Sequence, residues 1–185
     1  KIVPVSEPTT ISYSKLEDSL TSHSEKHLSA VRQEFKTEPL IILSGEPGCG
    51  KSYLARNLGC SLPLTMSVDT SFTDISSSVQ FEEWIRNGGV LILDEFNLAP
   101  ENTFVFFNLI KSGFEIYHDD KTYLINKETH KVLFIGNCPK KVISRNLHAY
   151  LDAKHISMVS AYPSHIINHY KGTLEIKDIK QSLIQ

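Results

Sequence analysis

Residues 40–52 read Leu-Ile-Ile-Leu-Ser-Gly-Glu-Pro-Gly-Cys-Gly-Lys-Ser. The first four are apolar, and a short apolar run bounded by turn residues is typical of a buried strand in a parallel sheet. The loop that follows, Ser44 to Gly50, holds three glycines and one proline. Lys51 to Gly59 then has a partial apolar face, which predicts a helix. A strand, a glycine-rich loop and a helix in this order indicate an α/β domain.

The loop and its flanks fit the pattern Gly-x-x-x-x-Gly-Lys-Ser, the Walker A motif that cradles phosphate groups. Glycines let successive backbone N–H groups converge on an anion without Cβ clashes. We expect Lys51 to neutralise the β- and γ-phosphates of a nucleoside triphosphate, and the Ser52 hydroxyl to bind Mg²⁺. The predicted nucleotide-binding residues are Gly45, Glu46, Pro47, Gly48, Cys49, Gly50, Lys51, Ser52 and Tyr53.

Two further apolar runs end in polar residues. Val90 to Leu93 leads into Asp94 and Glu95, as in a Walker B strand, and Val132 to Ile135 is soon followed by Asn137. Ligands bind such sheets at the carboxyl ends of the strands, so we expect Asp94 to hold Mg²⁺ and Glu95 to polarise an attacking water. Asn137 either contacts the γ-phosphate or orients that water, although asparagine after glycine also suits an ordinary turn. The predicted catalytic residues are therefore Glu95, Asn137 and Lys51.

The rest of the chain alternates between helix and strand patterns. This alternation predicts a three-layer αβα fold, with a central parallel sheet of about five strands and a β-hairpin insertion. Helices are expected from about Tyr13 to Lys36, around Val79 to Ile85, from Pro100 to Gly113 and from Val142 to Leu151. Weaker strands are expected at Leu62 to Val68 and His155 to Val159, and the hairpin at Phe114 to Ile125. Trp84, Phe104 and Phe107 are expected in the core.

Charge and hydropathy narrow the range of functions. The 185 residues carry a formal net charge of −2, which gives no reason to expect nucleic acid to bind across the whole surface. A local basic patch at Lys140, Lys141 and Arg145 stays open as an alternative to an ordinary solvated face. No apolar run approaches the roughly 20 residues that span a bilayer, so we predict no membrane span.

The three cysteines are Cys49, Cys60 and Cys138, an odd number without the spacing of a zinc site. At opposite ends of one helix, Cys49 and Cys60 would lie roughly 16 Å apart, too far for a disulfide. Reduced thiols favour a cytosol-like compartment, so we expect a cytoplasmic or otherwise intracellular protein.

Taken together, the motifs resemble those of the AAA+ ATPases, in the branch of the MoxR-like proteins, midasin and the dynein-related domains. The resemblance is carried by GEPGCGKS at residues 45–52, GGVLILDEFNLAP at 88–100 and FIGNCP at 134–139. In this branch an Asn-Leu-Ala-Pro-like turn follows the acidic pair, as it does here, and a hairpin follows the next helix. The resemblance covers residues about 39 to 163.

The resemblance implies that Lys51, Ser52, Asp94, Glu95 and Asn137 carry ATP binding and hydrolysis with Mg²⁺. It also implies a homo- or hetero-oligomeric ring in which an arginine of one subunit reaches the neighbour's γ-phosphate. In this chain Lys154 stands at the corresponding position and Arg145 lies nearby, so both are candidates for a trans-acting residue. The expected organisation is a leader and helix at 1–38, the nucleotide-binding core at 39–162, and at 163–185 the start of a lid segment or a C-terminal tail. The helical lid is expected to be incomplete or absent.

Three functions remain open from the sequence. The first is an ATP-hydrolysing module that remodels a partner macromolecule, and the second is a nucleotide-binding regulatory or scaffold module with weak or no turnover. The third is a nucleic-acid helicase core, which the balanced charge disfavours. The sequence contains no Asn-Lys-x-Asp motif, which would recognise a guanine base. The expectation that the nucleotide is ATP rather than GTP rests on the family resemblance.

Overall fold

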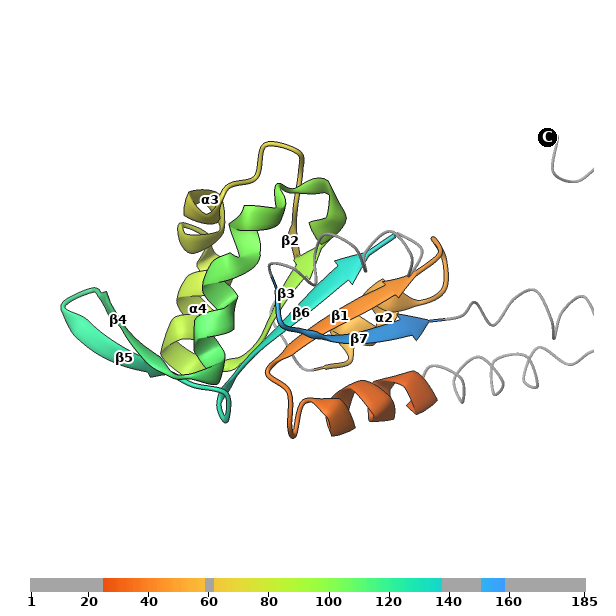
Figure 1. The fold of residues 1–185 in the computed structure, drawn as a ribbon, viewed down its shortest axis with the longest axis horizontal. Helices are drawn as coiled ribbons and strands as arrows, with labels where there is room; N and C mark the ends of the chain where they lie inside the picture. Colours follow the sequence, from red (N-terminus) through yellow and green to blue (C-terminus); the bar gives the residue numbers. More distant parts are fainter. Residues whose placement is uncertain (1–24, 59–61, 138–150, 159–185) are drawn as a thin grey trace, which may run out of the picture.

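The computed structural model describes residues 25–58, 62–137 and 151–158 (Figure 1). Its strands are β1 (Leu40–Gly45), β2 (Leu64–Thr65), β3 (Gly89–Asp94), β4 (Phe114–His118), β5 (Lys121–Ile125), β6 (His130–Gly136) and β7 (Lys154–Met158). Its helices are residues 25–34, α2 (Lys51–Arg56), α3 (Phe72–Ser76), α4 (Val79–Asn87) and the 3₁₀ helices η1 (Phe96–Leu98) and η2 (Glu101–Lys111).

Five parallel strands form the central sheet in the order β2-β3-β6-β1-β7. The three apolar runs found in the sequence are its middle strands, β3, β6 and β1. Buried on both faces, these strands need the near-continuous apolar sequence that they have. The α/β class and the five-stranded parallel sheet flanked by helices are thereby confirmed.

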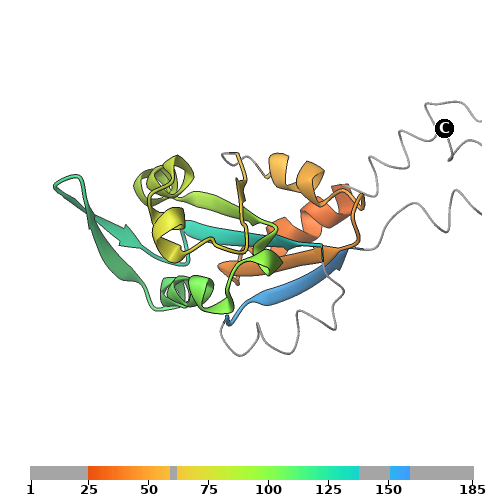
Figure 2. The same cartoon turned by 90° about the horizontal axis from the view of Figure 1, so that it is seen from above.

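Side chains alternate between two faces of the sheet, and each face has its own core. Leu40 and Ile42 belong to a cluster with aromatic residues of α4 and η2. Ile41 and Leu43 belong to a second cluster, with Val31 of the helix at residues 25–34 and residues of α2. Figure 2 shows α4 and η2 at one end of the sheet, apart from α2 and the helix at residues 25–34. The expected core residues Trp84, Phe104 and Phe107 are at most 3% exposed.

The strand order determines where the predicted site lies. β6 pairs with β1 on one side and β3 on the other, with Ser44 opposite Gly136 and Asp94 opposite Ile135. The three strands point the same way, so the loops that follow them leave from one edge of the sheet. Residues far apart in the sequence meet at this edge.

Several predicted boundaries were wrong. The second strand is confined to Leu64–Thr65, and α2 ends at Arg56 rather than Gly59. No helix was predicted between Ser67 and Ser78, a stretch rich in Ser, Thr and Asp, yet it contains α3. The Ser71 hydroxyl accepts the Asp74 N–H, and the Asp74 carboxylate accepts the Ser71 N–H. This reciprocal capping box starts a helix, and its Ser-x-x-Asp spacing was readable in the sequence.

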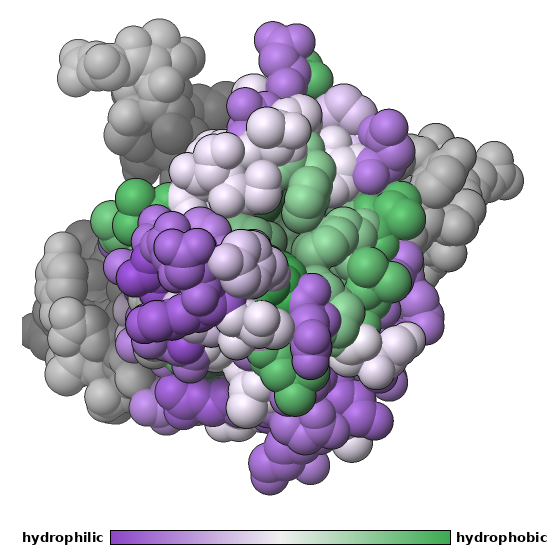
Figure 3. Space-filling view, turned by 90° about the vertical axis from the view of Figure 1, so that its left-hand side faces the viewer, coloured by the Kyte–Doolittle hydropathy of each residue, from purple (hydrophilic) through white to green (hydrophobic). Residues whose placement is uncertain are grey.

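The β4–β5 hairpin was correctly predicted, and it projects from the body of the molecule (Figure 1). Asp119 and Asp120 have positive φ angles of 49° and 57°, as the tight hairpin turn requires. Arg86 of α4 pairs with Asp119 and with Glu82, so the hairpin tip is tied to α4. Seen from the hairpin side, the surface mixes hydrophilic residues with a hydrophobic area (Figure 3). The exposed apolar and aromatic side chains include Leu98, Val105, Leu109, Tyr117 and Leu124.

Several expectations lie outside the described residues: the leader, the helix at Val142 to Leu151, the lid segment, and the basic patch with Arg145. Cys60 and Cys138 also lie outside them, whereas Cys49 is a buried free thiol. Among the helices that the structure describes, none has both the length and the apolar character needed to cross a membrane.

Candidate functional site

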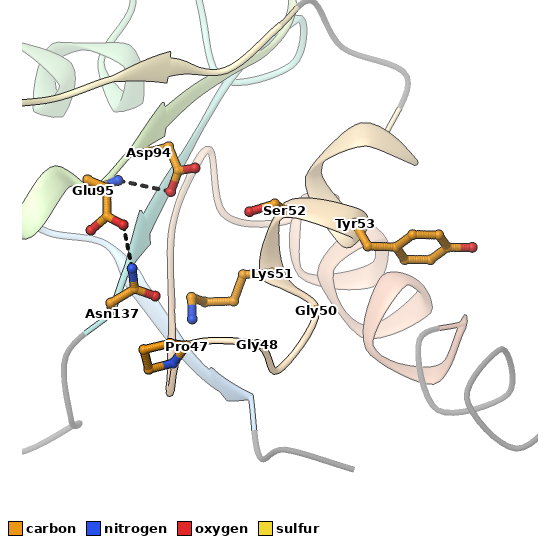
Figure 4. Close-up of a pocket in the computed structure, with 9 residues that line it drawn as sticks. All are labelled: Pro47, Gly48, Gly50, Lys51, Ser52, Tyr53, Asp94, Glu95 and Asn137. Atoms are coloured by element: carbon orange, nitrogen blue, oxygen red, sulfur yellow. Dashed lines mark hydrogen bonds between the residues drawn. The ribbon is translucent and has the colours of Figure 1, made fainter. Parts of the chain in front are cut away.

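A pocket of about 310 Å³ opens at the carboxyl edge of the sheet (Figure 4). Its walls come from the loop after β1, the first turn of α2 and the ends of β3 and β6. The lining residues are Pro47, Gly48, Gly50, Lys51, Ser52, Tyr53, Asp94, Glu95 and Asn137. Residues from all three predicted motifs therefore line one pocket. Three of the predicted nucleotide-binding residues do not line the pocket. These are Gly45, Glu46 and Cys49, which instead contact the Lys51 ammonium from within the loop.

The loop after β1 wraps around the Lys51 side chain, which is only 5% exposed. The Lys51 Nζ donates hydrogen bonds of 2.8 Å to the carbonyl oxygens of Gly45 and Glu46, and it lies 3.6 Å from the Cys49 Sγ. Within the described part of the chain this ammonium makes no ion pair. A buried cation that is bound only by neutral carbonyls favours an anion nearby, because burial has removed its hydration.

Gly50 lets the loop turn directly into α2. Its φ of 94° lies in the left-handed region, where a side chain would be strained, and its carbonyl accepts the Leu54 N–H. The helix begins at Lys51, so Ser52 and Tyr53 occupy its first turn beside the loop. This geometry explains why the pattern needs glycine immediately before Lys51.

Asp94 and Glu95 both face the pocket, although neighbouring residues on a strand point to opposite faces. Glu95 resolves this conflict by leaving the strand geometry, with φ 54° and ψ 30°. The Asp94 Oδ1 accepts the Glu95 N–H at 2.9 Å, which favours this turn. A left-handed non-glycine residue costs roughly 1–2 kcal/mol, and such strain is concentrated at functional sites. This left-handed turn was not predicted from the sequence.

Asn137 links the ends of β6 and β3. Its side-chain amide donates to the Glu95 Oε1, and its backbone N–H donates to the Asn97 Oδ1 at 3.2 Å. Gly136 makes this approach possible, because a Cβ there would lie 2.6 Å from Phe96 Cε1 and 2.9 Å from the Asn97 Oδ1. Asn97 is thus a positioning residue, whereas the sequence indicated it only as part of a family-like turn.

A second contact beneath the loop was also missed. The Ser44 hydroxyl is 1% exposed, and its oxygen lies 2.6 Å from the His155 Nε2. This contact joins the end of β1 to β7, next to the first glycine of the loop. Serine and histidine 111 positions apart give no local signal, because only the order of the strands brings them together.

Lys154 does not line the pocket. It begins β7, and its ammonium lies 3.7 Å from the Glu34 carboxylate on the helix at residues 25–34. A residue that acts on a neighbouring subunit need not line its own pocket, so a trans-acting Lys154 stays a prediction. Arg145 lies outside the described residues.

Oxygen ligands suited to Mg²⁺ are present in the pocket. The Ser52 hydroxyl and the Asp94 carboxylate both line it, and hard divalent cations prefer oxygen donors. Glu82, His118 and Asp119 form another cluster near the hairpin tip. There the Arg86 guanidinium already pairs with both carboxylates, which disfavours a cation.

A comparison with models of known protein families finds none that matches the chain, and a search of curated proteins finds no significant match. The chemistry of the pocket is therefore the basis for a functional assignment.

Proposed function

We propose that the protein binds a nucleoside triphosphate with Mg²⁺ in this pocket and hydrolyses its terminal phosphoanhydride bond, as an ATPase of the AAA+ type. The observation that carries the proposal is one pocket lined by Lys51, Ser52, Asp94, Glu95 and Asn137. These residues supply a buried cation, an oxygen pair suited to Mg²⁺, a carboxylate and an amide. Phosphoryl transfer needs these groups, because its catalysis rests on positioning and electrostatic stabilisation.

Each side chain has a defined role in this proposal. The Lys51 ammonium exchanges its hydrogen bonds to the loop carbonyls for phosphate oxygens, which carry full negative charge. Ser52 and Asp94 would hold Mg²⁺, which when bound neutralises charge on the β- and γ-phosphates.

Glu95 would accept a proton from water as the water oxygen attacks the γ-phosphorus. The bond from that phosphorus to the bridging oxygen breaks, and the nucleoside diphosphate carries the electron pair away. Asn137 contacts the Glu95 carboxylate, and its amide can orient that carboxylate, the water or a γ-phosphate oxygen.

We further propose that turnover remodels a partner macromolecule within a homo- or hetero-oligomeric ring. The regulatory or scaffold alternative remains, because Lys154 cannot offer the bidentate geometry of arginine and is paired with Glu34. A ring enzyme gains activity per subunit as concentration rises, whereas a binding module shows low, concentration-independent turnover.

The decisive experiment combines calorimetry and turnover. Titration with MgATP and with MgGTP should give saturable binding at one site per chain, and removal of Mg²⁺ should weaken it. Phosphate release should then be measured over a wide range of protein concentrations. Lack of saturable uptake of either nucleotide by the folded chain would overturn the proposal. Binding with no release at any concentration would leave only the scaffold function.

A further inference from the structure

The pocket has an aromatic rim at one end. Among the described residues that line it, Tyr53 is the aromatic one, and its side chain is 55% exposed. It stands on the first turn of α2, directly after Ser52. The Asn57 side-chain amide donates to the Tyr53 backbone carbonyl at 2.8 Å, a hydrogen bond that does not involve the ring.

The acidic and amide side chains of the pocket lie on the opposite side of Ser52 from the Tyr53 ring. In Figure 4 Asp94, Glu95 and Asn137 gather at one side, Lys51 and Ser52 lie in the middle, and the Tyr53 ring extends away on the far side. A triphosphate with its terminal phosphate near Glu95 and Asn137 would run past Lys51 and Ser52. Its nucleoside would then leave the phosphate site toward Tyr53.

Resting on the proposed function, we propose that the Tyr53 ring is the platform on which the nucleobase stacks. An exposed aromatic face beside a phosphate site has the geometry that stacking requires. Stacking on an aromatic side chain is tolerant of base identity, since every base has a π face. The site is therefore expected to discriminate weakly between ATP and GTP, and to bind both more tightly than CTP, whose ring is smaller.

The test uses two variants of the full chain and two ligands. Tyr53→Ala removes the ring and Tyr53→Phe retains it, while MgATP carries a base and Mg-tripolyphosphate carries none. Tyr53→Ala should weaken MgATP binding by about 5- to 150-fold, the range that base stacking provides. Tyr53→Phe should stay within about twofold of the parent, because the stacking face is unchanged. Neither variant should alter tripolyphosphate binding.

Tyr117 offers a matched control. It is an exposed tyrosine on the hairpin, 71% exposed and absent from the pocket lining, so Tyr117→Ala should leave both affinities unchanged. Equal weakening of both ligands by Tyr53→Ala, or no weakening of MgATP, would overturn the stacking role. Failure of the parent chain to bind either ligand would instead overturn the proposed function. The two failures are therefore distinguishable.

Discussion

The side-chain amide of Asn137 donates a hydrogen bond to the Glu95 carboxylate and so joins the ends of β6 and β3 across the pocket. These two side chains are 42 positions apart in the sequence. Their contact fixes the direction of a carboxylate that would otherwise be free to rotate on an exposed turn. In the proposed reaction, the same amide contacts the group that activates water.

Asn137→Ala should therefore slow turnover much more than it weakens binding. Removing one preorganised donor from an active site typically costs roughly 10²-fold or more in kcat. The affinity for MgATP should change little, because Lys51 and the loop remain. Single-turnover phosphate release and calorimetry on the same preparation measure the two quantities. A variant that loses affinity while its turnover at saturation is unchanged would contradict this role.

Glu95→Gln should leave MgATP binding intact and stop hydrolysis. The amide preserves the size of the side chain and can still contact Asn137, but it cannot accept a proton from water. Loss of a general base costs roughly 10²- to 10⁴-fold in rate. Phosphate release under saturating MgATP is the measurement, and turnover at the parental rate would remove Glu95 from its assigned role.

Lys51→Ala should abolish measurable nucleotide binding. Charge-assisted hydrogen bonds contribute about 1.5–3 kcal/mol each, so losing the ammonium weakens affinity by roughly 100-fold or more. Since Lys51 is buried, Lys51→Met serves as a control that retains much of the packing volume. Both variants should show no measurable binding while the thermal midpoint of the Met variant stays near the parent's. Tight binding by a folded Lys51→Met variant would contradict the prediction.

Gly136→Ala should destabilise the fold and disturb the site together. The added methyl would overlap the Phe96 ring and approach the Asn97 amide, so the Phe96–Leu98 segment would have to move. Overpacking of this kind costs about 1–3 kcal/mol. Urea unfolding measures the loss, and hydrolysis should fall too because Glu95 precedes the displaced segment. Gly89→Ala is a useful comparison. A Cβ there would meet no atom within 4 Å, so this variant measures only the strain of a side chain at a φ of 90°, without overpacking.

Stability should decrease below neutral pH because of His130. This side chain is 4% exposed and packs edge-on against Trp84, and burial lowers its pKa below the ordinary value of 6.5. Between the lowered folded value and 6.5, the unfolded chain binds a proton that the folded chain does not, so acid favours unfolding.

Urea unfolding free energies should therefore decline as pH falls through 6.5 toward the folded-state pKa of His130. His130→Gln should reduce this slope although it lowers stability overall. If the unfolding free energies of parent and variant change with pH at the same slope, groups other than His130 cause the acid sensitivity.

Local sequence patterns predicted the three middle strands of the sheet and the residues that line the pocket, but not the extent of β2. Leu40 to Leu43, Val90 to Leu93 and Val132 to Ile135 were recognisable because strands buried on both faces must be continuously apolar. The helix of α4 was recognisable from its apolar spacing and the glycines that follow it. These signals are local, and they were sufficient to identify the residues that line the pocket.

The contacts that support the pocket could not be predicted from local signals. The Ser44–His155 pair and the Asn97–Asn137 hydrogen bond depend on which strands are neighbours. The left-handed turn at Glu95 is disfavoured by its residue type and is held by the surrounding structure. By contrast, the Ser71–Asp74 capping box was a local signal that reasoning from composition overlooked.

The position of β6 between β1 and β3 sets the distance between these two strands at the edge where the pocket opens. Two inter-strand spacings of about 4.8 Å hold the Walker A strand about 10 Å from the strand that ends at Asp94. Both spacings are maintained by backbone hydrogen bonds along β6, so side-chain attraction alone cannot draw the lysine loop and the acidic turn together. Lys51 and the carboxylates of Asp94 and Glu95 therefore line one pocket from two strands that β6 holds apart.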